Sequence, residues 1–149
     1  MKKLVFLLIS LLLSASVIGQ TALIPNIQSE LGMVVDVPVM VTDWNDIVCF
    51  TVFINFDPAK LEFLYAELWH PEMLIHEQNG RIGMCFVTEV DSITHPYTIN
   101  GELAHLYFQV NGTSELKFGR CEVVQYPYTF LNIQYTNGSV FQGKSVSKW

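Results

Sequence analysis

The chain has 149 residues, 13% of them aromatic, and a formal net charge of −6 with the histidines neutral. This acidic balance argues against nucleic acid and anionic membrane surfaces as partners. The length suits one domain with a core of its own, and the many Val, Ile, Phe and Tyr residues favour strands.

The N-terminus has the pattern of a secretory signal peptide. Lys2 and Lys3 precede an apolar block at residues 4–13, and small residues follow as far as Gly19. The block is shorter than the roughly 20 apolar residues of a membrane-spanning helix. We therefore predict cleavage near Gly19 and a secreted, periplasmic or cell-surface domain at residues 20–149. Loss of the two lysines takes the formal charge from −6 to −8. A retained N-terminal anchor is the alternative.

The first part of this domain is predicted to form three strands. These cover residues 22–27, 33–42 and 48–56, and the polar residues 42–46 are expected to be a turn. The odd positions of the second strand are expected to face inward. In the third strand every even position is apolar, which predicts one buried face. Its inward side chains are Val48, Phe50, Val52, Ile54 and Phe56.

The third strand is expected to stop at Asp57, because Pro58 lacks an N–H and disfavours helix at the residue before it, while the Asp57 side chain can close an Asx-turn. Asn79 and Gly80 are the strongest hairpin signal in the chain. Further strands are predicted at residues 61–68, 74–78, 82–89, 102–110, 116–124 and 135–141. About nine short strands with turns between them predict an all-β fold, a β-sandwich.

Four segments resemble cohesin domains, the modules that hold dockerin-bearing enzymes on cellulosome scaffolds. FTVFINFDPAKLEFL is similar to the strand-Asp-Pro-strand segment of cohesins, and NGRIGMCFVTEV to the hairpin that follows. TINGELAHLYFQVNGTSELKF and TNGSVFQ are similar to the later strands, in the family's order. The resemblance implies a nine-stranded jelly roll with sheets ordered 8-3-6-5 and 9-1-2-7-4.

The resemblance also implies a non-catalytic module that binds a dockerin-type partner through the outer face of the 8-3-6-5 sheet. The alternation of the strands gives the same outward residues. These are Cys49, Thr51, Phe53, Asn55, Gly83, Cys85, Val87 and Lys117, with Cys121 beside them. Thr51 stands where many cohesins have an acidic residue, which is a departure from ordinary dockerin recognition. No cofactor is implied, and calcium would enter only with the partner.

Two other functions stay open. A carbohydrate-binding module would use aromatic residues in predicted loops, although such rings also cap the ends of sandwich cores. The candidates are Trp44, Trp69, Tyr97, Tyr126 and Tyr128. A surface-assembly subunit would contact copies of itself through strand edges or the apolar face.

The residues with reactive or metal-binding side chains give weaker signals. Two of the three cysteines could pair after export, but a disulfide requires Cα atoms about 4.4–6.8 Å apart, and we expect three reduced thiols. No histidine has metal-ligand spacing to a cysteine, so no metal site is predicted. No catalytic motif occurs, so no enzyme is expected. Asp91, Ser92 and Ile93 resemble a short O-glycosylation signal at Ser92.

Overall fold

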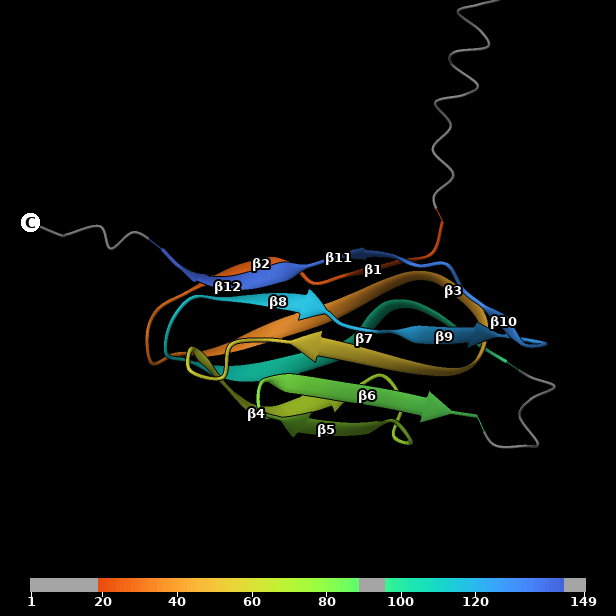
Figure 1. The fold of residues 1–149 in the computed structure, drawn as a ribbon, viewed down its shortest axis with the longest axis horizontal. Coiled ribbons are helices and arrows are strands. Elements are labelled where there is room, and N and C mark those ends of the chain that lie inside the picture. Colours follow the sequence, from red (N-terminus) through yellow and green to blue (C-terminus); the bar gives the residue numbers. More distant parts are fainter. Residues whose placement is uncertain (1–18, 89–95, 144–149) are drawn as a thin grey trace, which may run out of the picture.

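The computed structural model describes residues 19–88 and 96–143 (Figure 1). The predicted signal peptide and Ser92 lie outside these residues, apart from Gly19. Within them the chain is all-β, and no helix has the length and apolarity needed to cross a membrane. The strands are β1 (Thr21–Leu23), β2 (Asn26–Ser29), β3 (Val34–Asn55), β4 (Leu61–Leu68), β5 (Leu74–Gln78), β6 (Arg81–Val87), β7 (Tyr97–Val110), β8 (Ser114–Phe118), β9 (Glu122–Gln125), β10 (Thr129–Phe130), β11 (Gln134–Thr136) and β12 (Gly138–Gln142).

Both sheets are built on β3, which runs along the molecule in Figure 1. Its first part pairs with β7, and its second part pairs with β6 from Cys49 to Asn55. The pairing with β7 shifts register between Val41 and Ile47, where Asp43 and Asp46 have φ angles of 57° and 55°. Such irregularities bend a strand and let it pass from one sheet to the other. The predicted turn at residues 42–46 is therefore wrong: these polar residues bend one strand and do not separate two.

The strands form two layers on either side of the core. In one layer, β5 pairs with β6, β6 with β3, and β3 with β8 and β9. In the other, β4 pairs with β7, β7 with β3, β3 with β1, and β1 with β11. Two of the pairings are parallel, β1 with β11 and β2 with β12. The predicted jelly-roll topology stays a prediction.

The described residues contain twelve strands where the sequence predicted nine. Two predicted strands merge into β3, while three others each divide in two and β10 is additional. The predicted strand at residues 116–124 divides because Gly119, Arg120 and Cys121 leave the ladder between β8 and β9.

The core contains the side chains that the alternation predicted. All five even positions from Val48 to Phe56 are buried, as are Val35, Val37, Val39 and Val41. Met33 was predicted to face inward but is 56% exposed, because it precedes β3 at the turn after β2.

Candidate functional site

The outward side chains of β5, β6, β8, β9 and the second part of β3 make one surface, here called the β3–β6 face. All eight residues predicted as partner-binding lie on it, paired across neighbouring strands. In these pairs Cys49 lies opposite Val87, Thr51 opposite Cys85, and Phe53 opposite Gly83. Asn55 lies opposite Arg81 on one side and Lys117 on the other. The buried even positions of β3 and β6 point the other way, so the period of two fixes this face.

Phe53 lies in the middle of the β3–β6 face, across Gly83. A Cβ atom on Gly83 would stand only 2.9 Å from the ring of Phe53, so the lack of a side chain makes room for that ring. The guanidinium carbon of Arg81 lies 3.9 Å from the ring centroid, in cation–π contact. This contact places a cationic hydrogen-bond donor beside an aromatic ring. Phe53 is partly exposed to solvent, and Arg81 is exposed.

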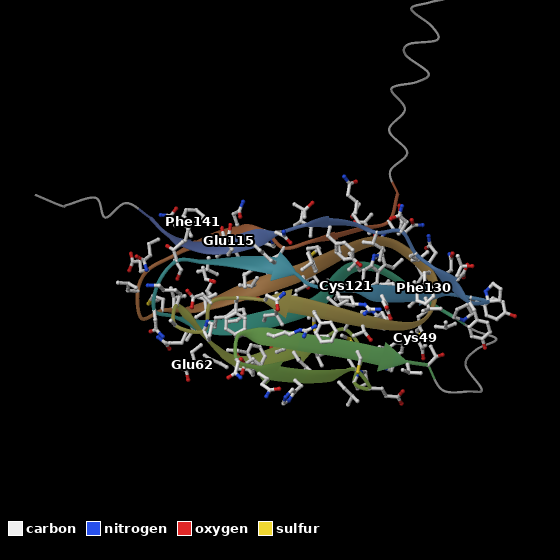
Figure 2. All side chains as sticks on the ribbon, viewed as in Figure 1. Cys49, Glu62, Glu115, Cys121, Phe130 and Phe141 are labelled. Atoms are coloured by element: carbon white, nitrogen blue, oxygen red, sulfur yellow. The ribbon has the colours of Figure 1, made fainter. Side chains whose placement is uncertain are left out.

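An apolar row crosses one end of the face. Phe130 pairs with Val124, Val124 with Cys49, and Cys49 with Val87, so the row spans β10, β9, β3 and β6. Phe130 and Val87 are 66% and 69% exposed, and Leu74 on β5 is 68% exposed. Figure 2 shows Phe130 and Cys49 at the same end of the molecule. A contiguous exposed apolar surface of this kind is characteristic of binding sites.

Sequence reasoning missed Phe130 as part of this face. No strand was predicted over residues 129–130, since two residues are too few to show any periodicity. The sequence offered one signal for this residue: Phe130 comes shortly after the turn at residues 126–128 that follows β9.

Most of the described basic residues lie on or beside this face. Arg81, Lys117 and Arg120 belong to it or to the connection between β8 and β9, and only Lys60 lies elsewhere in the described residues. Lys117 Nζ is 2.8 Å from Glu115 Oε2, and Arg120 is 2.8 Å from Glu122 Oε1. Among the described residues Arg81 has no carboxylate partner within 4 Å, which leaves its charge available to a ligand.

Cys121 does not lie on the β3–β6 face, so that prediction is wrong. It follows the break after β8 and packs against the hydrophobic core, where its thiol donates to the carbonyl oxygen of Phe53 at 3.7 Å. Burial raises the pKa of its thiol, and of the Cys49 thiol as well. The chain turns Cys121 inward because β8 and β9 are separate strands.

All three cysteines are free thiols. Cys49 and Cys85 are diagonal neighbours, since each lies opposite a different residue of the other strand. Diagonal Cα atoms in a sheet are about 7–8 Å apart, beyond the span of a disulfide. The expectation of three reduced thiols stays a prediction, which this spacing of Cys49 and Cys85 favours.

The aromatic residues proposed for glycan binding separate into two groups. Trp44 is fully buried in β3, and its indole N–H donates to the carbonyl oxygen of Thr21 at 3.1 Å. Trp69 and Tyr97 are half-buried and pack edge to face with Phe86. The prediction is therefore wrong for Trp44, whose ring is buried, whereas for the half-buried Trp69 and Tyr97 glycan binding stays a prediction.

Tyr126 and Tyr128 remain exposed, by 47% and 74%. They belong to the turn between β9 and β10, next to Phe130. These two residues extend the β3–β6 face and do not gather with Trp44 or Trp69.

The outer face of β4, β7 and the first part of β3 has a different character. Tyr65 and Tyr107 stack there with centroids 4.4 Å apart. His105 bridges two carboxylates, with Nδ1 2.8 Å from Asp36 and Nε2 2.6 Å from Glu102. The hydrogen bonds to Glu102 and to Asp36 raise the pKa of this imidazole. In residues 19–88 and 96–143 no three His, Cys, Asp or Glu side chains gather as metal ligands would.

The fold is similar to that of solved cohesin domains. The sixth cohesin of scaffoldin B from Acetivibrio cellulolyticus, solved with a Cel5 dockerin, has a TM-score of 0.74 and 20% identity, covering 84% of this chain and 99% of that one. A cohesin from Clostridium thermocellum in the Coh-OlpA-Doc918 complex gives 0.75 and 14%, over 84% and 99%. A non-cellulosomal cohesin of the archaeon Archaeoglobus fulgidus gives 0.72 and 14%, over 84% and 91%.

This likeness shows a cohesin-like β-sandwich fold, as the sequence resemblance implied. No protein-family model matches the sequence, and the comparison with curated proteins gives no match.

Proposed function

We propose that this chain is an exported, non-catalytic protein-binding module that holds its partner on the β3–β6 face. The observation that carries the proposal is the Phe53 ring, seated on Gly83 and held against Arg81, with exposed Leu74 and Val87 nearby. Aromatic and arginine side chains supply much of the affinity in protein interfaces, and aliphatic neighbours exclude water around them.

The cohesin-like fold favours a dockerin-type partner, because two of the similar cohesins were solved in complex with dockerins. The partner would bring its calcium with it, and the chain itself would need no cofactor. Glu122, opposite Thr51 on this face, is paired with Arg120, while Arg81 has no carboxylate partner among the described residues. We therefore expect a partner that presents a carboxylate next to apolar side chains.

Fewer exposed aromatic residues support a glycan-binding function than the sequence suggested. Of the five aromatic residues first considered, Trp44 is buried, Trp69 and Tyr97 are half-buried, and the two exposed ones are Tyr126 and Tyr128. Both lie beside Phe130, so a glycan would compete with a protein partner for the same end of the face.

The test is a pull-down from the culture supernatant of the native organism with immobilised residues 20–149. It is run with calcium and again with a chelator, and retained proteins are identified by mass spectrometry. A parallel column has Phe53→Glu, which changes a partly exposed side chain and leaves the core intact. A third column has Phe141→Glu, a matched change on β12, which lies at the other end of the molecule from Cys49 and Phe130 (Figure 2).

The proposal predicts a protein retained by the wild type and by the Phe141 variant, in the presence of calcium only. The Phe53 variant should lose it, because a buried unpaired carboxylate in an interface is costly. Equal retention on the Phe53 column would move the site off this face. Retention of polysaccharide alone, abolished by Tyr128→Ala, would favour the glycan function.

A further inference from the structure

A cavity of about 340 Å³ adjoins the β3–β6 face where β3 ends and β8 begins. Asn55 and Lys117, which lie opposite one another on that face, belong to its lining. The other lining residues are Phe56, Asp57, Thr113, Ser114 and Glu115. The cavity is therefore continuous with the surface proposed to hold the partner.

Hydrogen bonds of Ser114 and Asp57 fix the wall of this cavity. The Ser114 residue is 5% exposed, and its hydroxyl accepts from the backbone N–H of Asp57 at 2.9 Å and donates to the carbonyl oxygen of Glu115 at 2.8 Å. Asp57 Oδ1 accepts from the backbone N–H of Ala59 at 2.9 Å, as in an Asx-turn. These bonds tie the turn after β3 to the start of β8, so the cavity is formed before any ligand binds.

The lining carries more negative than positive charge. Asp57 and Glu115 are carboxylates, and Lys117 is the cation among the lining residues. Lys117 Nζ is already 2.8 Å from Glu115 Oε2. Asp57 forms no ion pair within 4 Å among the described residues. A carboxylate without a cationic partner in a preformed cavity favours a positively charged ligand group.

The neighbouring basic side chains lie outside the cavity. The guanidinium of Arg81 lies over the ring of Phe53, two residues before Asn55 on β3. The stem of Lys60 covers Gly112, where a Cβ atom would be 2.5 Å from Lys60 Cδ. Neither residue belongs to the lining, so the charge on Asp57 stays available to a ligand.

The rest of the wall suits a long side chain with a cationic end. Phe56 contributes apolar surface, against which the methylene stem of a lysine or arginine packs. The hydroxyl of Thr113 and the second carboxylate oxygen of Asp57 are hydrogen-bond acceptors. An ammonium or guanidinium group offers several donors to such a wall.

We propose that this cavity receives a lysine or arginine side chain of the partner, an inference that rests on the proposed function. Arg81 and Lys117 lie on either side of Asn55, two strand spacings or about 10 Å apart. The partner would thus present a carboxylate to Arg81 and a basic side chain to Asp57 at separate points. Two opposite charges at separate points fix the orientation of the partner on the face.

The experiment follows the backbone amide signals of residues 20–149 by NMR during titration with N-acetyl-lysine N-methylamide. N-acetyl-norleucine N-methylamide, which lacks the ammonium group, is the neutral control probe. The variant Asp57→Asn removes the charge and keeps an oxygen for the N–H of Ala59. The matched control Glu72→Gln makes the same change in an exposed turn outside the cavity. Asp57→Asn is also added to the pull-down as a further column.

The proposal predicts saturable shifts of the signals of Asp57, Ser114 and Glu115 with the lysine probe alone. Asp57→Asn should weaken this binding by at least about fivefold, because a charged acceptor becomes neutral, and the control should not. Its column should also retain less of the partner. Absent shifts, shifts unchanged in Asp57→Asn, or full retention on its column would overturn this proposal and leave the β3–β6 face as the binding surface. Equal retention on the Phe53→Glu column contradicts the proposed function instead.

Discussion

Single side chains decide between the two binding functions considered for this protein. Phe53 is half-buried, with Gly83 beside its ring and the guanidinium of Arg81 over the ring, 3.9 Å from its centroid. Trp44 has the larger aromatic surface, yet its indole is buried and hydrogen-bonded to Thr21. A ring contributes to recognition only where the backbone leaves a face of it open.

Replacing Trp44 with alanine tests the burial of that residue. We expect Trp44→Ala to lower the free energy of unfolding by about 3–5 kcal/mol, because a large core side chain is replaced by a cavity. Urea denaturation followed by circular dichroism measures this loss. The control Tyr128→Ala, on an exposed turn residue, should stay within about 0.5 kcal/mol of the wild type. A nearly neutral Trp44 variant would contradict its placement in the core.

At the scale of elements, turns and strand pairs hold the β3–β6 face in register. The predicted hairpin at Asn79 and Gly80 joins β5 to β6, and both residues have positive φ angles, 51° and 82°. Type I′ turns require this geometry. The turn fixes which residues of β6 lie opposite β3, and so it places Gly83 under Phe53.

Substitution of Gly80 should therefore be costly. A Cβ atom there would be 2.5 Å from the carbonyl oxygen of Phe56 and 2.7 Å from Pro58 Cδ, in addition to the strain of a φ of 82°. Gly32 has a similar φ of 81° but open space around it. We expect Gly80→Ala to lower the free energy of unfolding by about 1–3 kcal/mol more than Gly32→Ala does. Equal losses in denaturant titrations would mean that the contact is absent.

The pair of β3 and β7 carries a pH-dependent contact through His105. Its pKa is raised in the folded protein by Glu102 and Asp36, so the folded state binds the proton more tightly than the unfolded state does. The stabilising contribution is complete below the unfolded pKa of about 6.5 and is lost as pH rises through the higher folded value.

The stability advantage of the wild type over His105→Gln should therefore be larger at about pH 5.5 than at about pH 8.5. Denaturant titrations at both values measure it. An advantage that is independent of pH, or one that grows at high pH, would show that the two carboxylates do not hold a protonated imidazole.

At the scale of the whole molecule, β3 makes the two layers depend on one another. Its first part belongs to one layer and its second part to the other, with buried residues along both. A layer cannot unfold without removing β3 from the other. The β3–β6 face is likewise held by the second part of this strand.

Unfolding should accordingly be a single cooperative transition. We expect the loss of strand signal in circular dichroism and the change in tryptophan fluorescence to have the same midpoint in urea. Of the three tryptophans, Trp44 reports on the region where β3 passes between the layers and Trp69 on the residues after β4, while circular dichroism reports on all the strands. Two separate midpoints would mean that the layers unfold independently.

The sequence alone determined which face of each strand is buried. Alternation in residues 48–56 and 82–87 predicted both the core positions and seven of the eight residues of the β3–β6 face, because a period of two leaves each side chain only two directions. The hairpin at Asn79 and Gly80 was also predictable, since few residues tolerate positive φ.

Tertiary structure decided the features that depend on how strands bend, end and find neighbours. The bend of β3 at residues 42–46 buried Trp44, and the break before β9 turned Cys121 inward. The pairing of β10 brought Phe130 to the face. Each depends on contacts between residues far apart in the chain, and local periodicity carries no information about such contacts.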